Sequence, residues 1–325
     1  MTKAVRIDRP GGPEAMTIAE VTLPPPGPGE ARVRHTAIGL NFIDVYHRSG
    51  LYPLPALPGG LGLEAAGVVE AVGEGVTAAA PRQRVAYAAP PPGSYAEARN
   101  IAADRLVPLP DDIDDRTAAA MMLKGMTAEY LLRRTFRVTA GQTILFHAAA
   151  GGVGLIACQW AKALGATVIG TVSTPEKAAL AAAHGCDYPV VTADQDFVAA
   201  VETLTEGARL PVVYDSVGKD TFLRSLACLA RRGTLVSFGQ SSGPVPPFDI
   251  GVLGAHGSLY LTRPSLMDYT VSRDELLASA GALFEVVRAG KVRIEVNQTY
   301  PLAKVVEAHR DLEGRRTTGS SVLIP

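Results

Sequence analysis

One segment, residues 143 to 164, constrains the fold of this chain more than any other. Thr143 to Phe146 is short, apolar and β-rich, residues 148 to 154 read Ala-Ala-Ala-Gly-Gly-Val-Gly, and an apolar helical pattern follows. A strand that leads through such a turn into a helix is the context of the dinucleotide-binding fingerprint of doubly wound sheets. Ala148 takes the place of the usual first glycine, so the pattern here is A-x-x-G-x-x-G.

The two remaining glycines of the pattern have different expected roles. Gly151 is expected to let the backbone approach a pyrophosphate, whereas Gly154 lets the helix pack close to the strand. The free N–H groups and the dipole at the start of the helix favour phosphate. Glycines at a helix start also occur for packing alone, but the strands and helices that follow favour dinucleotide binding. The expected contacts are Ala150, Gly151, Gly152, Val153 and Gly154.

Beyond this turn, apolar strands alternate with helical patterns. The strands are expected at residues 143 to 148, 166 to 172, 188 to 191, 212 to 216, 233 to 238 and 258 to 261. This alternation predicts a parallel, doubly wound α/β sheet of the Rossmann type. Its last strand would be an exposed apolar edge, so we expect a homodimer that pairs through residues 258–261.

The chain on either side of this region has another texture. Residues 1–125 are dense in Gly and Pro, with short β-rich pieces at 31–34 and 66–72 between turn signals. Ser272 and Glu275 form a capping-box pattern before a helix, and residues 321–325 read as a strand that pairs with the first part. The expected fold class is α/β, with a Rossmann domain (126–262) inserted in a discontinuous, mostly antiparallel β-rich domain (1–125 and 263–325).

The end of the second parallel strand indicates which cofactor is bound. An NAD enzyme normally has an acidic residue there that bonds the ribose 2′-OH, and the strand from Thr167 to Val172 ends without one. Thr174 is placed to cap a helix begun by Pro175. Ser173, the N–H groups of that helix and Lys177 would hold a 2′-phosphate. NADPH is therefore predicted over NADH, the alternative for Lys177 being a solvated surface lysine.

Charge, hydropathy and cysteine content argue against several classes of protein. The formal net charge is −1 and the pI about 6.6, which gives no support to binding of nucleic acid or an anionic membrane. No run of 18 apolar residues occurs, and the N-terminus lacks a signal-peptide pattern, so a cytoplasmic protein is expected. Cys158, Cys186 and Cys228 are widely separated and form no disulfide framework or metal cluster pattern.

Further motifs make the chain similar to a known family. Residues 141–162 read GQTILFHAAAGGVGLIACQWAK, residues 39–46 read GLNFIDVY, and 49–53, 123–128 and 263–266 read SGLYP, LKGMTA and RPSL. Together they resemble the zeta-crystallin-type quinone oxidoreductases, a zinc-free branch of the medium-chain dehydrogenase/reductase superfamily. The resemblance covers essentially the whole chain. It implies a GroES-like fold for the β-rich domain and NADPH-dependent reduction of small quinones at an interdomain cleft.

The resemblance also implies site residues. The nicotinamide and substrate cleft would involve Asn41, Asp44, Tyr46, Tyr52, Thr127 and Arg263. Further cofactor contacts would involve Tyr130, Ser173, Lys177, Thr192, Ser216, Val217, Phe238 and Gln240. Thr192 departs from the family, which usually has a tyrosine near the adenosine phosphate. Arg82-Gln83 also departs from it, standing where Gly-Asp is common in a β-turn.

No metal site is expected. Zinc-dependent relatives carry a cysteine at the position of Asn41 and a histidine at that of Leu63, and a structural zinc lobe would need cysteines near residues 88 to 100. The six histidines show no ligand spacing. Without a Lewis acid, simple alcohols are poor substrates, whereas the reduced anion of a quinone is delocalised. Tyr46, Tyr52 and Arg263 would then supply hydrogen bonds to the developing oxyanion, with Asn41 and Asp44 in support.

Two other functions stay open. The same cofactor and oxyanion stabilisation would serve an NADPH-dependent reductase of α,β-unsaturated aldehydes or ketones. A non-catalytic NADPH-binding, RNA-binding or structural protein is the third possibility. In that case Tyr46 and Tyr52 would be half-buried aromatics and Arg263 would pair with a carboxylate.

Overall fold

The computed structural model describes all residues from Met1 to Pro325, which form two compact units. The first, here named the β-rich unit, contains Met1–Lys124, Thr270–Gly281 and Ile294–Pro325. The second, the parallel-sheet unit, contains Gly125–Tyr269 and Ala282–Arg293. The predicted domain limits at 125/126 and 262/263 stay a prediction. No helix in either unit is both long and apolar enough to cross a membrane.

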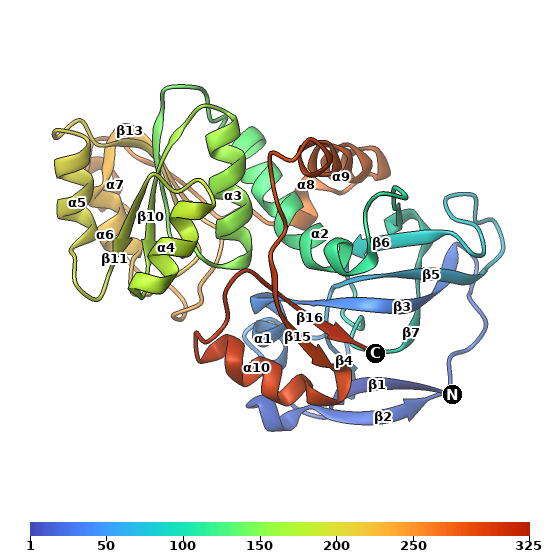
Figure 1. Ribbon diagram of the computed structural model, residues 1–325. Coiled ribbons are helices and arrows are strands. Elements are labelled where there is room, and N and C mark those ends of the chain that lie inside the picture. Colours follow the sequence, from blue (N-terminus) through green and yellow to red (C-terminus); the bar gives the residue numbers. More distant parts are fainter. The chain divides into compact units, whose positions relative to one another are not determined.

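Antiparallel pairing dominates the β-rich unit (Figure 1). Its seven-stranded sheet has the order β15-β16-β3-β5-β6-β8, with β7 also paired to β3, and its three-stranded sheet has the order β2-β1-β4. Alternate positions of the long strand β3 are buried, and apart from His35 they are apolar, as expected of a strand at the centre. The strands are β1 (Thr2–Ile7), β2 (Thr17–Val21), β3 (Glu30–Leu40), β4 (Gly59–Gly60), β5 (Glu64–Val72), β6 (Arg84–Ala88), β7 (Ala98–Ala102), β8 (Val107–Pro108), β15 (Val296–Pro301) and β16 (Ser320–Ile324).

The end of the chain returns to this unit, as predicted. Ser321 of β16 lies opposite Leu40 of β3 in an antiparallel pair, and β15 adds to β16 in parallel. β3 leads directly into α1 (Phe42–Ser49), and α10 (Val305–Glu313) precedes β16. Short helical turns are η1 (Pro13–Ala15), η2 (Ala103–Arg105) and η4 (Leu302–Lys304).

Two longer helices contain the limits of the units. They are α2 (Asp115–Tyr130), which continues as the π-helical turn η3 (Leu131–Thr135), and α9 (Arg273–Arg288). The predicted capping box before α9 is confirmed. The Ser272 N–H donates to the Glu275 carboxylate at 2.9 Å, and the Glu275 N–H donates to Ser272 Oγ at 3.2 Å.

The parallel-sheet unit contains the predicted Rossmann sheet. Its six strands have the order β11-β10-β9-β12-β13-β14, and every neighbouring pair is parallel. The order reverses between β9 and β12, and ligands of such sheets bind outside the carboxyl ends of the strands at this point. The strands are β9 (Thr143–Phe146), β10 (Thr167–Val172), β11 (Tyr188–Val191), β12 (Leu210–Asp215), β13 (Leu229–Ser237) and β14 (Tyr260–Thr262).

Helices cover this sheet in two groups. α3 lies beside α4 against β10, whereas α5 and α6 form a separate pair, with α6 against β12 and β13 (Figure 1). The strands are apolar along most of their length because both faces are covered. The helices are α3 (Gly152–Ala163), α4 (Pro175–Ala183), α5 (Phe197–Leu204), α6 (Phe222–Ala227), α7 (Gly251–Ala255) and α8 (Leu266–Tyr269).

Candidate functional site

The turn after β9 has the geometry that its glycines predict. A Cβ on Gly154 would lie 2.4 Å from the Ala148 carbonyl oxygen and 2.6 Å from that of Ala149, so this position must be glycine for α3 to pack. A Cβ on Gly151 would meet only the Ala148 oxygen, at 3.2 Å. Gly151 caps α3, whose first N–H groups have no acceptor within the helix. Packing therefore explains Gly154, whereas a Cβ at Gly151 would have a single close neighbour, in the same turn.

The carboxyl end of β10 brings three predicted residues together. The Thr192 N–H and hydroxyl both donate to the Val172 carbonyl, at 2.9 and 3.2 Å, which places Thr192 beside Ser173. Thr174 caps α4 as predicted and accepts the Lys177 N–H at 3.3 Å. No carboxylate stands between Thr171 and Thr174. The first turn of α4, which contains Lys177, thus follows the carboxyl end of β10 directly, and its Lys177 N–H is taken up by the cap.

Close backbone contacts hold the turns after β12 and β13. The Asp215 carboxylate accepts the N–H groups of Val217 and Gly218 at 2.8 and 3.0 Å, which fixes the turn with Ser216. Phe238 donates its N–H to the Asp215 carbonyl at 2.8 Å, so this turn lies beside Ser216.

Arg263 lies beside this pair of turns. Its Nη1 donates to the carbonyls of Ser237 and Gly239, at 2.8 and 3.0 Å. Arg263 therefore supports the segment that carries Phe238 and Gln240.

Thr127 and Tyr130 are buried on α2 in the same unit. Tyr130 is 2% exposed and stacks on Tyr269 with a centroid distance of 4.4 Å and an interplanar angle of 12°. Burial raises the pKa of Tyr130, with the neighbouring Tyr269 adding to the rise and Arg263 opposing it, so its hydroxyl stays protonated. Tyr269 was not predicted, because nothing local in the sequence marks a stacking partner that lies far along the chain.

In the β-rich unit, the start of α1 is held by buried charges. The Asn41 N–H donates to Asp44 Oδ2 at 2.9 Å, and Asn41 Nδ2 donates to Glu64 Oε2 at 2.7 Å. Lys124 Nζ donates to the Leu40 carbonyl at 3.2 Å and lies 3.5 Å from Glu64 Oε2. A Cβ on Gly39 would lie 2.2 Å from that oxygen, so glycine is needed here to admit the carboxylate. Asn41 is thus oriented by a buried ion pair.

A second buried network ends on Asp44. Its Oδ2 accepts the Tyr95 hydroxyl at 2.8 Å, Tyr95 lies 3.1 Å from His309 Nε2, and Arg48 Nη1 lies 3.0 Å from His309 Nδ1. Arg48 in turn binds both oxygens of Glu313 at 2.7 Å. Burial raises the pKa of Asp44 to about 7, against the hydrogen bonds from Tyr95 and Asn41, which lower it. Burial likewise lowers the pKa of His309 to about 3.

Tyr46 and Tyr52 form an edge-to-face pair in the same unit. Their ring centroids are 5.2 Å apart at 64°, and the Tyr52 N–H donates to the Tyr46 carbonyl at 3.0 Å. Tyr46 is 8% exposed, whereas Tyr52 is half-buried. Tyr46 lies in α1 and Tyr52 follows it closely, so the structure brings Asn41, Asp44, Tyr46 and Tyr52 into one neighbourhood.

Glu64 and Lys124 are functional candidates that sequence reasoning missed. Lys124 lies in the segment 123–128 that carries the resemblance, and Glu64 follows Leu63, but a charged residue in a motif does not reveal its partner. Tyr95 and His309 were missed for the same reason. No group of three or more His, Cys, Asp or Glu side chains is arranged to hold a metal ion.

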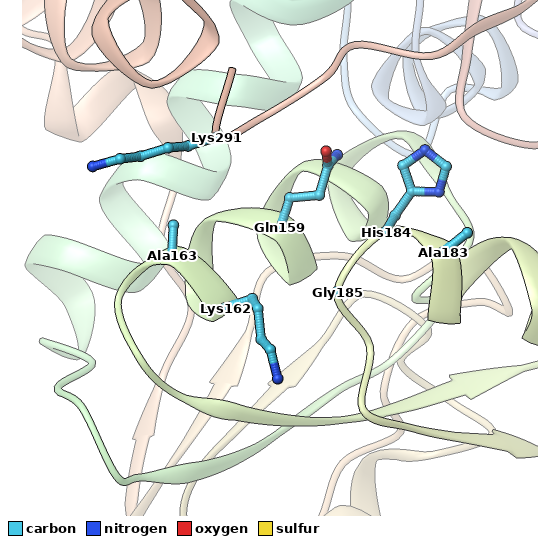
Figure 2. Close-up of a pocket in the computed structure, with 7 residues that line it drawn as sticks. All are labelled: Gln159, Lys162, Ala163, Ala183, His184, Gly185 and Lys291. Atoms are coloured by element: carbon cyan, nitrogen blue, oxygen red, sulfur yellow. The ribbon is translucent and has the colours of Figure 1, made fainter. Parts of the chain in front are cut away.

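A surface hollow of about 250 Å³ lies at the other end of α3 (Figure 2). It is lined by Gln159, Lys162, Ala163, Ala183, His184, Gly185 and Lys291. The ammonium groups of Lys162 and Lys291 reach out in different directions, and Lys162 pairs with Asp187. Lysines at helix carboxyl ends offset the local negative dipole. With no polar groups converging on it, the hollow is not a candidate site.

Comparisons with known proteins agree with this geometry. The alcohol dehydrogenase GroES-like domain family matches residues 27–132, and the zinc-binding dehydrogenase family matches residues 152–275. Quinone oxidoreductase of Pseudomonas aeruginosa is 54% identical over 100% of both chains, and 2-haloacrylate reductase of a Burkholderia species is 46% identical over 100% of this chain and 99% of that relative.

Solved structures extend the likeness to three dimensions. The crystal structure of Escherichia coli quinone oxidoreductase complexed with NADPH is 49% identical, with a TM-score of 0.98, covering 99% of this chain and 100% of that one. The chain therefore belongs to the quinone oxidoreductase family of the medium-chain dehydrogenase/reductase superfamily.

Proposed function

We propose that this protein is an NADPH-dependent quinone reductase that works without a metal ion. The observation that carries the proposal is the dinucleotide site at the carboxyl ends of β9, β10 and β12, where a bare backbone at Gly151 meets the free N–H groups of α3. Full-length relatives at 49–54% identity are quinone oxidoreductases, which supports a quinone as the acceptor, and the E. coli complex supports NADPH.

The residues divide into three proposed roles. The turn from Ala150 to Gly154 binds the pyrophosphate, and Ser173, Lys177 and Thr192 bind the 2′-phosphate. Thr127, Tyr130, Ser216, Val217, Phe238 and Gln240 line the rest of the cofactor, together with Asn41 and Tyr46. Tyr46, Tyr52 and Arg263 donate hydrogen bonds to the reduced acceptor, while Asn41 and Asp44 hold the loop before α1. NADPH supplies the reducing equivalents when bound.

A steady-state acceptor screen tests the function. With NADPH as donor, a small quinone should be reduced, and NADH in parallel should support a lower kcat/KM. Tyr52→Phe should slow reduction with little change in NADPH affinity, because a preorganised donor to the acceptor oxygen is lost. Tight NADPH binding with no reduction of any acceptor would instead favour a non-catalytic protein.

Lys177→Ala tests the cofactor preference. Loss of a charge-assisted phosphate contact should weaken NADPH by about 1 to 3 kcal/mol and leave NADH almost unchanged. Lys162→Ala is the matched control, since Lys162 pairs with Asp187 on the same unit, away from β10's carboxyl end. Equal losses for both cofactors would remove Lys177 from the 2′-phosphate site.

Reduction of an activated carbon–carbon double bond is the second candidate function. It is favoured by the 46% identity to a protein named 2-haloacrylate reductase over the full length of this chain. The same cofactor site would serve, because only the acceptor differs. Comparing kcat/KM for a small quinone, an enone and a 2-haloacrylate under one NADPH concentration separates the two functions.

We also propose a homodimer that pairs through β14. This strand is an edge of the six-stranded sheet, and Tyr260 and Leu261 are 62% and 37% exposed. An apolar edge is a template for pairing, and pairing of identical edges closes a twofold assembly. Light scattering should report a dimer, and Leu261→Arg should shift it to a monomer. A monomeric parent protein would refute this assembly.

Independence from zinc and a cytoplasmic location complete the proposal. Asn41 is bonded to Glu64 and Leu63 is buried, at positions where zinc-dependent relatives carry ligands. Full activity after chelation, with no zinc in elemental analysis, is expected. Activity that is lost on chelation and restored by zinc would contradict it, and fractionation of the native cells tests the location.

A further inference from the structure

A continuous chain of hydrogen bonds joins buried polar side chains near the point where the parallel sheet reverses its strand order, between β9 and β12. His147 follows β9 and is 0% exposed. Its Nδ1 lies 2.9 Å from Thr171 Oγ1 of β10, and its Nε2 lies 2.9 Å from Ser225 Oγ of α6. Ser225 Oγ lies 3.2 Å from Asp215 Oδ2 at the end of β12. Four polar side chains from four elements therefore meet in the interior.

The donors and acceptors present fix the direction of this chain. The Asp215 carboxylate and the Thr221 carbonyl can only accept, so the Ser225 hydroxyl donates to one of them and accepts from His147 Nε2. His147 Nδ1 is then left to accept the proton of the Thr171 hydroxyl, whose oxygen also accepts the Ala148 N–H at 3.3 Å. A neutral imidazole that accepts at Nδ1 carries its proton on Nε2 and donates to Ser225 Oγ. The Ser225 hydroxyl then donates onward to the Asp215 carboxylate or to the Thr221 carbonyl, which lies 2.9 Å away.

The charge state of His147 agrees with this direction. Burial lowers the pKa of His147 below its ordinary value, and the opposing attraction of Asp215 is the smaller effect. The imidazole is therefore neutral near pH 7, with one donor and one acceptor. The Asp215 carboxylate accepts the N–H groups of Val217 and Gly218 and the Thr221 hydroxyl, at 2.8 to 3.0 Å.

Both ends of the chain are turns of the dinucleotide site. One end is the Ala148 N–H, in the turn that leads to Gly151 and α3. The other is Asp215, whose carboxylate shapes the turn with Ser216 and Val217. A buried polar chain is stable only when every member is satisfied, so displacement of either turn leaves a buried group without its partner.

We propose that His147 is a positioning residue for NADPH and NADH alike, which ties the turn after β9 to the turn after β12 through Thr171 and Ser225. The inference rests on the proposed placement of the cofactor at these turns. His147 itself touches neither the phosphates nor the nicotinamide, since it lies wholly in the interior beneath them. Its effect on binding is transmitted through the backbone at Ala148 and Val217.

A pair of substitutions at Thr171 separates the hydrogen bond from packing. Thr171→Val keeps the side-chain volume but leaves His147 Nδ1 and the Ala148 N–H without a partner. The dissociation constants of NADPH and NADH should both rise about tenfold, by the same factor, the order expected for buried groups left unsatisfied. Thr171→Ser keeps the hydroxyl and loses a methyl group, so it should bind both cofactors as the parent does.

A matched control removes a partner from another buried histidine. His35 of the β-rich unit is 4% exposed, and its Nε2 lies 2.8 Å from the Tyr87 hydroxyl. Tyr87→Phe should lower stability and leave both dissociation constants unchanged. Unchanged constants in Thr171→Val, or rises that differ between NADPH and NADH, would overturn the inference. Gly151→Ala tests the cofactor site separately: if it weakens binding while Thr171→Val does not, only this inference fails.

The tautomer of His147 can be measured in the parent protein, with the conservative variant Thr171→Ser used only to assign the signal. Long-range nitrogen–proton correlation spectra of the histidine-labelled protein should show the His147 proton on Nε2. Comparison with Thr171→Ser, in which the same tautomer is expected, assigns the signal. A proton on Nδ1, or a doubly protonated ring at pH 7, would overturn the direction of the chain and with it the proposal.

Discussion

The turn after β9 and the start of α1 are both held in a defined shape, but by different interactions. The turn after β9 is a backbone site made of consecutive residues from Ala148 to Gly154, whose shape depends on missing side chains. The start of α1 is a side-chain site, in which Asn41 and Asp44 are held by Glu64, Tyr95 and Lys124 from distant parts of the chain. The first is fixed by local sterics, and the second by buried charges and hydrogen bonds.

This difference predicts which substitutions each region tolerates. A backbone site tolerates substitutions that do not alter the course of its backbone. It is disrupted when a Cβ is added where the backbone packs closely against other atoms. A buried-charge site tolerates no loss of a single partner, because the charge left behind is not solvated. Substitutions that separate steric from electrostatic control therefore test the comparison directly.

The largest expected effect is at the ion pair beside Asn41. Glu64→Gln leaves the ammonium of Lys124, whose side chain is 7% exposed, without a counter-charge, and this should cost about 3 to 5 kcal/mol of unfolding free energy. Adding Lys124→Met should recover most of the loss, since the pair is then removed as a whole. Urea unfolding of the four proteins measures the coupling, and additive losses would show that the two side chains do not depend on each other.

A steric effect of about 3 kcal/mol is expected at the turn after β9. Gly154→Ala places a Cβ against two carbonyl oxygens that the helix cannot move away from, so unfolding free energy should fall by about that amount. Gly151→Ala is the matched control. Its Cβ would meet one carbonyl oxygen, that of Ala148, at 3.2 Å, so the loss of stability should be smaller than at Gly154, while NADPH affinity falls because the backbone no longer approaches the phosphates. Comparable stability losses at both glycines would show that the turn is a packing feature only.

The third test concerns pH and the network at Asp44. The pKa of Asp44 is raised from its ordinary 3.8 to about 7, so its contribution to stability is present at low pH and is lost as pH rises through that window. The pKa of His309 is lowered from 6.5 to about 3, so its contribution is lost as pH falls. Between pH 7 and pH 5 the two changes oppose each other, at about 2 kcal/mol each.

Asp44→Asn should expose the histidine contribution. From pH 7 to pH 5 the variant should lose about 2 kcal/mol more unfolding free energy than the parent protein, because only the acid-sensitive group remains. Urea unfolding at the two pH values measures this difference. Equal losses in both proteins would mean that Asp44 does not bind a proton in this range, and would remove it from the network as a titrating group.

Sequence predicted the backbone site far better than the side-chain site. The strands, the glycine turn, the cap at Thr174 and the return of the last strand follow from local patterns, and the structure confirms them. The partners of Asn41 and Asp44 could not be predicted, since Glu64, Tyr95 and His309 meet them only through β-sheet register and the packing of α10. Tyr269 and the chain through His147 escaped prediction for the same reason, as each joins residues with no fixed sequence spacing.

The smallest expected effect concerns two residues in backbone conformations that favour glycine. Ala148 has φ +55° and Arg82 has φ +71°, and Ala148 stands at the first glycine position of the dinucleotide fingerprint. A left-handed residue with a Cβ is strained, and glycine relieves the strain while gaining freedom in the unfolded chain. The net result for Ala148→Gly and Arg82→Gly should be a gain of about 0.5 kcal/mol in unfolding free energy.

Ala148 probes the turn after β9, whereas Arg82 lies in the turn between β5 and β6, outside both compared regions, and serves as the control. Ala148 and Arg82 are both exposed, so neither change removes a buried contact. NADPH affinity should stay within about twofold of the parent in Ala148→Gly, because its N–H still donates to Thr171 and its carbonyl still accepts from Gly151. A gain at Arg82 with a loss at Ala148 would show that the alanine methyl stiffens the phosphate-binding turn. The backbone site would then depend on a side chain as well, and the two regions would differ less than their geometry implies.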